Sequence, residues 1–322
     1  MSLKVVSLFC GAGGLDLGFE RAGHHIIWAN DFDKFAIETY KKNFNIEHTE
    51  IILASIQDIK SDDIPNSDIV IGGFPCQGFS MANPYRSVDD KRNELYLELL
   101  RVIQDKKPKF FLAENVVGLT NLGGYDSPED KKNKTGRIFK TVLSDFRKSG
   151  YKVIWKIVNS AEYGVPQVRK RVIIIGVRKD INFEYSFPKP IFDKENYKTL
   201  KDAISDLPKD FDENVANHTG TQHKVKINNY LGNRQLYWTK PSPTIVGRGG
   251  GTGGAVIHPH PDGNRRLSVR ECARIQTFPD NFIFQGSNGA CYRQIGNAVP
   301  PEMAYFLGLG FLDIKLNTGE IR

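Results

Sequence analysis

Apolar and polar positions follow two alternating patterns along the first 180 residues of the chain. Short apolar runs, each with the length of a buried strand, end in glycine or in polar residues. They lie at 3–9, 25–33, 68–74, 109–115, 151–159 and 171–177. Segments with helical spacing separate most of these runs, at 15–23, 34–44, 94–108 and 137–150. Strands that alternate with helices predict an α/β fold with a doubly wound, mostly parallel sheet.

The pattern changes between residues 181 and 265. This stretch is rich in Gly, Asn, His and basic residues and shows no sustained helical period. Such a composition is typical of short strands joined by long loops. Beyond it, residues 266–280 predict one more helix, and residues 294–312 predict a turn at Gly296 and Asn297 followed by an apolar helix. The chain therefore predicts a large α/β unit and a smaller, loop-rich unit.

Composition and charge limit the class of protein. The chain has 322 residues, of which 40% are hydrophobic and 25% charged, as in ordinary soluble globular proteins. It shows no apolar stretch of membrane-spanning length and no secretory signal pattern. A net charge of +7 is compatible with a polyanionic partner. The four cysteines form no CxxC pair, which argues against a zinc site or disulfide framework and predicts a reducing, cytoplasmic location.

The glycine-rich turn after the first apolar run is a candidate nucleoside site. Gly11, Gly13 and Gly14 separate this run from a helix, and glycine permits a tight turn and close approach of the backbone to a ligand. The spacing differs from the G-x-G-x-x-G dinucleotide motif, so an ordinary strand–helix turn is the alternative.

The second apolar run ends in acidic residues that suit the same ligand. Asp31 is placed to accept hydrogen bonds from ribose hydroxyls, and Phe32 is placed to lie against an adenine ring. The alternative is that Asp31 or Asp33 only caps the helix that begins near Lys34.

Cys76 is the candidate nucleophile. It follows a strand in the segment GGFPCQGFS at 72–80, directly after Pro75. The carboxyl end of a central strand faces the ligand crevice in such sheets, and a thiolate there is a nucleophile that positive neighbours favour. The alternative is a buried structural cysteine, the role that we expect of Cys10, Cys272 and Cys291.

Charged residues are expected at the same edge of the sheet. Glu114 ends a buried apolar run, so its carboxylate is expected at the carboxyl edge. Arg169 and Arg171 have the period-two spacing of residues on one strand face, so both guanidinium groups are expected to point the same way. A solvated strand face is the alternative for these arginines.

Six segments, taken in order, resemble the motifs of the DNA cytosine-5 methyltransferases. They are SLFCGAGG, GFPCQGFS, AENV, QVRKR, RLSVRECARIQTFPD and YRQIGNAVP. The resemblance extends from residue 5 to about residue 310. The chain length resembles that of the small bacterial enzymes that accompany restriction endonucleases.

The resemblance implies both domains and a cofactor. A catalytic and cofactor-binding domain would comprise residues 1–180 and 290–322, and a target-recognition domain residues 181–289, with a cleft for DNA between them. S-adenosylmethionine would be the methyl donor. Its contacts would come from Phe9, Gly11, Gly14, Asp31, Phe32, Ser55, Ile56, Pro75 and Asn297. Ser55 stands where the family usually has an adenine-binding Asp, so Ser55 and Asp58 are both candidates for that contact.

The resemblance also gives a chemical role to each candidate at the sheet edge. The Cys76 thiolate would add to carbon 6 of a cytosine flipped out of the duplex, while Glu114 neutralises ring nitrogen 3. Arg171, with Arg169 beside it, would bind the base carbonyl or a phosphate and favour the thiolate. No metal ion is expected. The residues expected to contact DNA are Gln77, Ser80, Thr244, Arg248 and Gly250.

The expected substrate is a specific short sequence of double-stranded DNA, the expected state is a monomer, and the expected functional partner is a restriction endonuclease. Three alternatives are a cytosine-5 methyltransferase acting on transfer RNA, a nicotinamide oxidoreductase, and an inactive DNA-binding module. The full recognition segment favours DNA over transfer RNA. The lack of G-x-G-x-x-G argues against the oxidoreductase, and the presence of Cys76, Glu114 and Arg171 argues against the inactive module.

Overall fold

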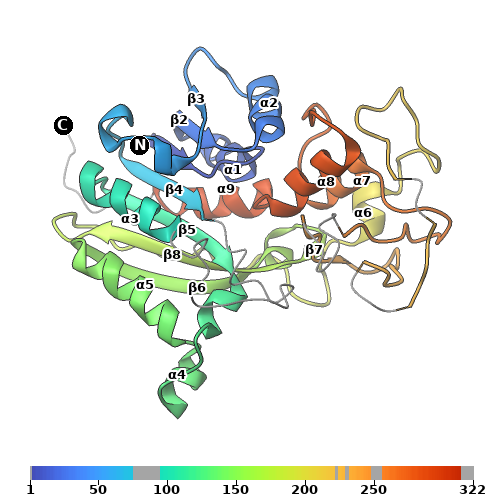
Figure 1. Cartoon of the computed structure of the whole chain (residues 1–322). Helices are drawn as coiled ribbons and strands as arrows, with labels where there is room; N and C mark the ends of the chain where they lie inside the picture. The colour runs from blue at the N-terminus through green and yellow to red at the C-terminus, as the bar shows by residue number, and fades with distance from the viewer. Residues whose placement is uncertain (1, 75–94, 222–223, 229–231, 248–255, 313–322) are drawn as a thin grey trace.

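A seven-stranded sheet in the order β3-β2-β1-β4-β5-β8-β6 forms the centre of the molecule (Figure 1). The structure is a computed structural model that describes residues 2–74, 95–221, 224–228, 232–247 and 256–312. The strands of this sheet are β1 (Lys4–Leu8), β2 (His25–Asp31), β3 (Glu50–Leu53), β4 (Ile69–Gly73), β5 (Phe110–Val116), β6 (Tyr151–Asn159) and β8 (Lys170–Arg178). Strands β1 to β5 pair in parallel, whereas β8 is antiparallel to both of its neighbours. The predicted α/β fold with a doubly wound, mostly parallel sheet is confirmed.

The connection between β6 and β8 explains why β8 is antiparallel. Residues 160–169 contain only the short 3-10 helix η5 (Ser160–Tyr163) and the two-residue strand β7 (Gln167–Val168). A parallel pair needs a crossover connection, usually a helix, whereas a short connection turns the chain back on itself. The sequence places no helix here, so β8 returns beside β6.

Helices cover both faces of the sheet, and alternate residues of each strand point to opposite faces. Val5 and Ile69 pack in one hydrophobic cluster with α1, α2 and α9, whereas the next residues, Val6 and Val70, pack in a second cluster with α3 and α5. The α-helices are α1 (Gly14–Arg21), α2 (Lys34–Asn43), α3 (Leu95–Lys106), α4 (Pro128–Asn133), α5 (Arg137–Lys148), α6 (Leu200–Ile204), α7 (Val269–Ile275), α8 (Asn288–Asn297) and α9 (Pro301–Leu309). The remaining 3-10 helices in the part of the chain that the structure describes are η1 (Ile56–Asp58), η2 (Ser61–Asp63) and η4 (Val117–Asn121).

Helix α9 packs closely against α1, which lies nearly 300 residues earlier in the chain. A Cβ atom on Gly18 would lie 2.6 Å from the Pro301 carbonyl oxygen, so only glycine permits this approach. The Arg21 guanidinium and the Glu302 carboxylate form an ion pair at 2.8 Å across the same contact. The C-terminal segment therefore returns to the N-terminal unit. The domain boundaries at residues 180 and 290 stay predictions.

The described part of residues 181–268 contains little regular structure, as its composition predicts. It holds only α6 and strand β9 (Ser242–Pro243), which pairs in parallel with β7. The turn predicted at Gly296 and Asn297 is wrong, because both residues belong to the last turn of α8. Ser287 caps the N-terminus of this helix by accepting a hydrogen bond from Ala290 N, and the helix ends only where Ala298 becomes extended.

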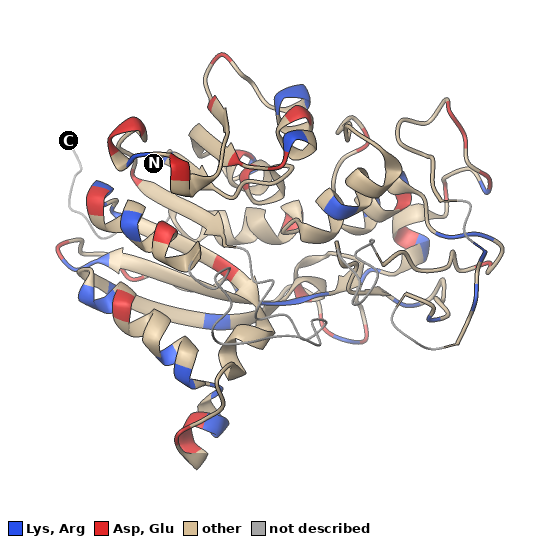
Figure 2. Ribbon diagram, viewed as in Figure 1, with Lys and Arg blue, Asp and Glu red and all other residues tan. Residues whose placement is uncertain are grey.

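Charged residues are interspersed over the described helices and loops (Figure 2). Within the described residues, the basic side chains are therefore not concentrated in one element. Among the residues that the structure describes, no helix has the length and apolar character needed to cross a membrane.

We expect Gly18→Ala to lower the free energy of unfolding by about 1–3 kcal/mol, because the added methyl group must displace α9 from α1. Thermal unfolding measures this loss. Gly289→Ala in α8 is the control, since its Cβ meets only Ser287 Oγ, at 3.9 Å, outside its own helix. Equal melting temperatures for the two variants would contradict the close approach of α1 and α9.

Candidate functional site

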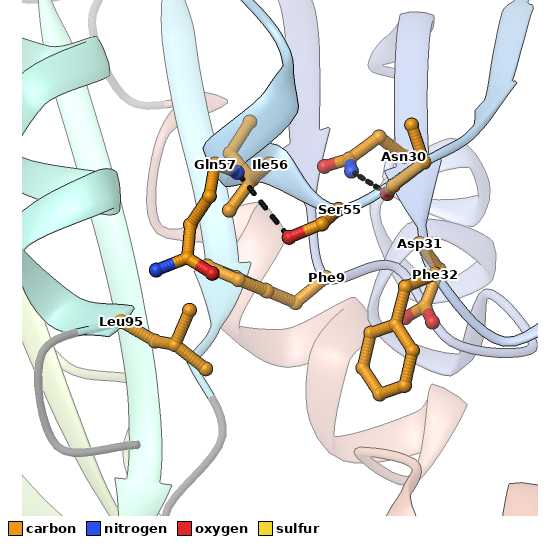
Figure 3. A pocket seen from close by; sticks show the side chains of 9 residues that line it. Phe9, Asn30, Asp31, Phe32, Ser55, Ile56, Gln57 and Leu95 are labelled. Atoms are coloured by element: carbon orange, nitrogen blue, oxygen red, sulfur yellow. Dashed lines mark hydrogen bonds between the residues drawn. The ribbon is translucent and has the colours of Figure 1, made fainter. Parts of the chain in front are cut away.

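A cavity of about 270 Å³ lies at the carboxyl ends of β1, β2 and β3 (Figure 3). Five residues predicted to contact a cofactor line it: Phe9, Asp31, Phe32, Ser55 and Ile56. The other lining residues, which the sequence did not indicate, are Asn30, Ala54, Gln57 and Leu95. Ligand crevices in doubly wound sheets lie at this edge, so the cavity is the candidate nucleoside site.

The turn after β1 binds the Asp31 carboxylate. Gly11 N donates to Asp31 Oδ2 at 2.9 Å, and Asp33 N donates to Asp31 Oδ1 at 2.8 Å. Burial raises the pKa of Asp31, while these backbone amides oppose that shift. Gly11 has a φ of +56° and Phe9 a φ of +55°. A bulky residue in this left-handed region is strained, and such strain is typical of functional sites.

The residue that caps the helix after β2 is Asp33 and not Asp31. The Asp33 side chain caps α2 by accepting hydrogen bonds from Phe35 N and Ala36 N. Asp31 therefore remains in the lining of the cavity, together with the 64% exposed ring of Phe32. An exposed aromatic ring and a carboxylate side by side fit the base and the ribose of a nucleoside.

Two further polar residues, Asn30 and Ser55, line this cavity. The Asn30 side chain donates to Ala54 O at 3.0 Å, but its buried Oδ1 has no hydrogen-bond partner among the described residues. Ser55 Oγ accepts from Gln57 N at 3.4 Å and caps η1. A buried acceptor that lacks a partner is costly, so the Asn30 oxygen fits a donor group of a bound ligand.

Asp16 lies behind the glycine turn, in the first turn of α1. Its carboxylate accepts hydrogen bonds from Ser7 Oγ and from Tyr40 OH, both at 2.7 Å. Burial raises the pKa of Asp16 to about 6, although the two hydroxyl groups lower it. Gly14, which follows the turn, packs its Cα against Val299 O and Ala298. The predicted contact of Gly14 with a cofactor stays a prediction.

Glu114 and Arg171 form an ion pair at the carboxyl end of β5. Arg171 Nε lies 2.8 Å from Glu114 Oε1, and each side chain is 11% exposed. Glu114 pairs in register with Gly73 of β4, and a Cβ on Gly73 would lie 3.0 Å from Glu114 Oε2. The missing side chain of Gly73 therefore leaves room for the carboxylate beside the strand that leads to Cys76.

Asn115 holds the end of β4 from the neighbouring strand. Its Nδ2 donates to Phe74 O at 3.2 Å, and its Oδ1 accepts from Val116 N at 2.8 Å. Phe74 is the last residue of this segment that the structure describes. The predicted site residues Pro75, Cys76, Gln77, Ser80, Arg248 and Gly250 lie outside the described residues.

Arg169 and Arg171 have different environments. Arg169 is 1% exposed and donates to the backbone oxygens of Ile245, Gly296 and Ala298 at 2.8–2.9 Å. Burial lowers the pKa of Arg169, and the nearby Arg171 lowers it further. Position 169 lies between β7 and β8 rather than within one strand, so the expected common strand face is not formed. A role of Arg169 on the base stays a prediction.

Thr244 and Asn297 are not among the residues that line the nucleoside cavity. Thr244 Oγ1 donates to Val168 O at 2.8 Å, and the exposed Asn297 packs against Gly247. A second cavity, of about 550 Å³, opens beside Thr244. It is lined by Val168, Arg234, Gln235, Leu236, Tyr237, Lys240, Pro241, Ser242, Pro243, Thr244 and Val246. Its two cationic side chains suit an anionic ligand.

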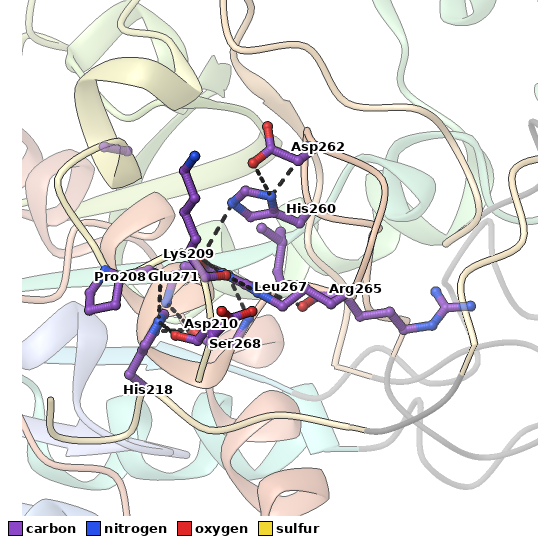
Figure 4. Close-up of polar contacts among 12 residues, drawn as sticks. Pro208, Lys209, Asp210, His218, His260, Asp262, Arg265, Leu267, Ser268 and Glu271 are labelled. Carbon is purple, nitrogen blue, oxygen red and sulfur yellow. Dashed lines mark hydrogen bonds and ion pairs between the residues drawn. The ribbon is translucent and has the colours of Figure 1, made fainter. Parts of the chain in front are cut away.

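A buried polar network fastens the loops around α7 (Figure 4). Glu271 is 1% exposed and accepts two hydrogen bonds from Arg265, at 2.8 and 2.7 Å. His218 lies 2.8 Å from Ser268 Oγ, the N-cap of α7. Burial lowers the pKa of His260, which lies 3.6 Å from Glu271. The S-x-x-E capping box at 268–271 is the sequence signal that could have indicated this network. Among the described residues, no group of side chains suits a metal ion.

The sheet order, the cavity at its carboxyl edge and the carboxylate–guanidinium pair fit a methyltransferase of the α/β class. The chain belongs to the family of C-5 cytosine-specific DNA methylases, whose family model matches residues 3–310. It is 40% identical to the Type II methyltransferase M.FnuDI of Fusobacterium nucleatum, over 95% of this chain and 93% of the relative. It is 37% identical to the Type II methyltransferase M.NgoFVII of Neisseria gonorrhoeae, over 98% of this chain and 88% of the relative.

A solved structure supports the same assignment. The fold matches a prophage-encoded protein of E. coli, described as a DNA modification methyltransferase, with a TM-score of 0.74 and 26% identity. The match covers 98% of this chain and 100% of the other. The family predicted from the motifs is confirmed. The protein is a DNA (cytosine-5) methyltransferase, which methylates cytosine in DNA.

We expect the buried Asp16 to make stability depend on pH. Its pKa is about 6 in the folded protein and 3.8 as the ordinary value, so protonation favours the folded state. This contribution of Asp16 to the free energy of unfolding is on the order of 3 kcal/mol. It is fully present below pH 3.8 and is lost as the pH rises through about 6.

Denaturation at several pH values between 3.5 and 7 measures this dependence. Asp16→Asn keeps an acceptor for Ser7 and Tyr40 but cannot ionise, so it reduces the loss of stability. Glu20, whose pKa burial and the nearby Asp16 raise to about 7, continues to titrate. Asp62→Asn, at an exposed position, is the control. An unchanged pH dependence in Asp16→Asn would contradict the assignment.

Proposed function

We propose that the chain transfers a methyl group from S-adenosylmethionine to carbon 5 of a cytosine within a specific short sequence of double-stranded DNA. The reaction would proceed through a covalent bond between Cys76 and a base flipped out of the duplex. The observation that carries this proposal is the 2.8 Å Glu114–Arg171 ion pair beside Gly73, three positions before Cys76. The nucleoside cavity at the same edge of the sheet supports it.

Each group at this edge has a chemical role in the proposal. Carbon 5 of cytosine is a poor nucleophile until the Cys76 thiolate adds to carbon 6. Glu114 would transfer or share a proton with ring nitrogen 3, so that no negative charge accumulates there. After methyl transfer, carbon 5 would lose its proton to water, ring nitrogen 3 would return the shared proton, and the bond between carbon 6 and the Cys76 sulfur would break, which regenerates the thiolate. Arg171 holds the Glu114 carboxylate in one orientation and would also contact the base carbonyl. Asn115 fixes the carbonyl of Phe74 and so orients the start of the segment that carries the nucleophile.

The cavity residues would bind the methyl donor. Asp31 would accept hydrogen bonds from the ribose hydroxyls, Phe32 would lie against the adenine ring, and Phe9 and Ile56 would enclose it. Asn30 Oδ1, which has no partner among the described residues, is a further acceptor for the adenine amino group beside Ser55. S-adenosylmethionine supplies an electrophilic methyl group when it is bound. Gly11, Gly14, Pro75 and Asn297 complete the proposed cofactor contacts.

The DNA would lie across the edge that carries the ion pair. Arg234 and Lys240 of the second cavity would contact phosphates beside Thr244. Some residues would contact the flipped base, fill the space that it leaves in the duplex, or contact the neighbouring bases. The residues proposed for these roles are Gln77, Ser80, Arg248 and Gly250. The proposal also includes a recognition domain of residues 181–289, a monomeric state, a cytoplasmic location and a partner restriction endonuclease.

The Type II relatives of this chain support DNA over transfer RNA as the substrate.

Methylation of a random-sequence pool of duplex DNA, followed by bisulfite sequencing, tests the substrate and reports the target sequence. Parallel incubation with transfer RNA tests the alternative. Methyl incorporation into transfer RNA but not into DNA would overturn the proposed substrate.

We expect Cys76→Ala to abolish methylation while DNA binding survives. Duplexes with 5-fluorocytosine at the target site should form a denaturation-resistant adduct with the wild-type protein and the methyl donor, but none with Cys76→Ala. Cys291→Ala, which removes a thiol from the buried side of α8, is the control and should still form the adduct. Turnover by Cys76→Ala would exclude the proposed nucleophile.

We expect Glu114→Gln to lower the methylation rate by about 10²–10⁴-fold, because an amide cannot deliver a proton to ring nitrogen 3. Affinity for S-adenosylmethionine, measured by calorimetry, should stay the same. Glu129→Gln on the exposed helix α4 is the matched control. A rate within threefold of the wild type would remove Glu114 from the mechanism.

A further inference from the structure

Three buried polar side chains form a connected group, and two of them bind the backbone of the segment that precedes residues 248–255. We name Gln167, Arg169 and Gln276 the polar clamp; their exposures are 0%, 1% and 0%. Gln167 Oε1 accepts a hydrogen bond from Ile245 N at 2.9 Å, and Arg169 donates to Ile245 O at 2.8 Å. Both backbone polar groups of one residue are therefore held by side chains that come from a different part of the chain.

The same clamp binds the junction of α8 and α9. Arg169 donates to Gly296 O and to Ala298 O at 2.9 Å, and Gln276 donates to Ile295 O at 2.7 Å. Gln167 Nε2 donates to Gln276 Oε1 at 2.8 Å and joins the two halves of the clamp. Apart from the bond between Gln167 and Gln276, the partners are backbone carbonyls or amides, so the clamp fixes main-chain positions.

Two glycines bring the segments that the clamp joins into direct contact. A Cβ on Gly296 would meet Gly247 N, and a Cβ on Gly247 would lie 2.7 Å from Arg293 O. The pairing of β7 with β9, Gln167 with Ser242, continues the contact upstream. Residues 242–247 thus contact residues 167–169 at one end and α8 at the other.

The clamp is linked to the proposed catalytic pair by only one intervening residue. Arg169 precedes Arg171, whose guanidinium pairs with Glu114 at 2.8 Å. The main chain at 167–171 therefore includes the residues that bind residues 242–247 and also Arg171, the partner of Glu114. Among the described residues, the buried Arg169 guanidinium is bound by three backbone oxygens and by no carboxylate within ion-pair distance, so its hydrogen bonds fix the relative position of these segments.

We propose that Gln167, Arg169 and Gln276 are positioning residues that set residues 244–247 relative to the Glu114–Arg171 pair. This inference rests on the proposed function. Residues 244–247 lead directly into the glycine-rich stretch that is expected to contact DNA. Loosening the clamp would displace residues 244–247 relative to the catalytic pair, so methylation rate and target selectivity would fall together.

The chain offers a matched control for the main test. Arg270 is also 1% exposed and also donates to three backbone oxygens, those of Ala216, Pro279 and Phe282, at 2.8–3.0 Å. It contacts neither residues 244–247 nor the catalytic pair in these bonds. Arg169→Lys and Arg270→Lys each replace a planar fork by a single ammonium group and should lower the melting temperature by similar amounts.

Both variants and the wild type are assayed on a random-sequence duplex pool with S-adenosylmethionine, below their melting temperatures, and the products are bisulfite sequenced. We expect Arg169→Lys to lower kcat by about 10²-fold, the size of effect that a 1 Å misplacement causes. The fraction of methylated cytosines outside the wild-type target motif should rise at least fivefold. Arg270→Lys should stay within twofold of the wild type on both measures.

Gln276→Met is the second test variant, since it keeps the side-chain length and removes the bonds to Gln167 and Ile295. This variant should show a lower kcat and more methylation outside the target motif, each by less than in Arg169→Lys. If Arg169→Lys does not fold, Gln276→Met alone tests the inference. Unchanged selectivity in the folded clamp variants, or the same loss in Arg270→Lys, would overturn the inference while leaving the proposed function intact. A wild-type protein that methylates no DNA would instead overturn the proposed function.

Discussion

The parallel register of β4 and β5 is the constraint on which the proposed active site depends. It places Gly73 opposite Glu114, so the position without a side chain lies beside the carboxylate. The antiparallel return of β8 then brings Arg171 opposite Val116, at the same end of β5. Main-chain hydrogen bonds, rather than flexible loops, therefore hold the acid, its guanidinium partner and the start of the Cys76 segment at one edge. Groups held on strands are positioned more accurately than groups on loops.

The cofactor cavity depends on the same edge but is built differently. Three strand ends supply its walls, and the backbone between β1 and α1 must turn sharply to leave it open. The left-handed conformations of Phe9 and Gly11 form that turn, and the Gly11–Asp31 hydrogen bond stabilises it. The buried Asp16 holds the turn from behind through Ser7 and Tyr40. Conformational strain at Phe9 persists because the surrounding bonds determine its backbone.

Outside the sheet, buried charges take the place of regular structure. The described loops around α7 have few ladder hydrogen bonds, and their backbone oxygens are instead bound by Arg169, Arg265 and Arg270. Each guanidinium has several donors in a fixed plane, so one side chain can fix segments that are distant in sequence. The desolvation cost of these charges is offset by multiple hydrogen bonds. This arrangement lets a loop-rich region keep a defined shape without a large apolar core of its own.

The sequence by itself determined the sheet, its helices and the family. Period-two and helical spacing are local properties, so the strands of the main sheet other than the short β3 could be located before the fold was known. Five of the cavity residues followed from motifs at strand ends. Tertiary structure alone decided the rest. Asn30 lines the cavity although no motif assigned it a role, and α8 continues through the predicted turn. Arg169 binds Ile245, 76 residues away, because burial and packing determine which distant carbonyls a guanidinium can reach, and the period along one strand contains no information about them.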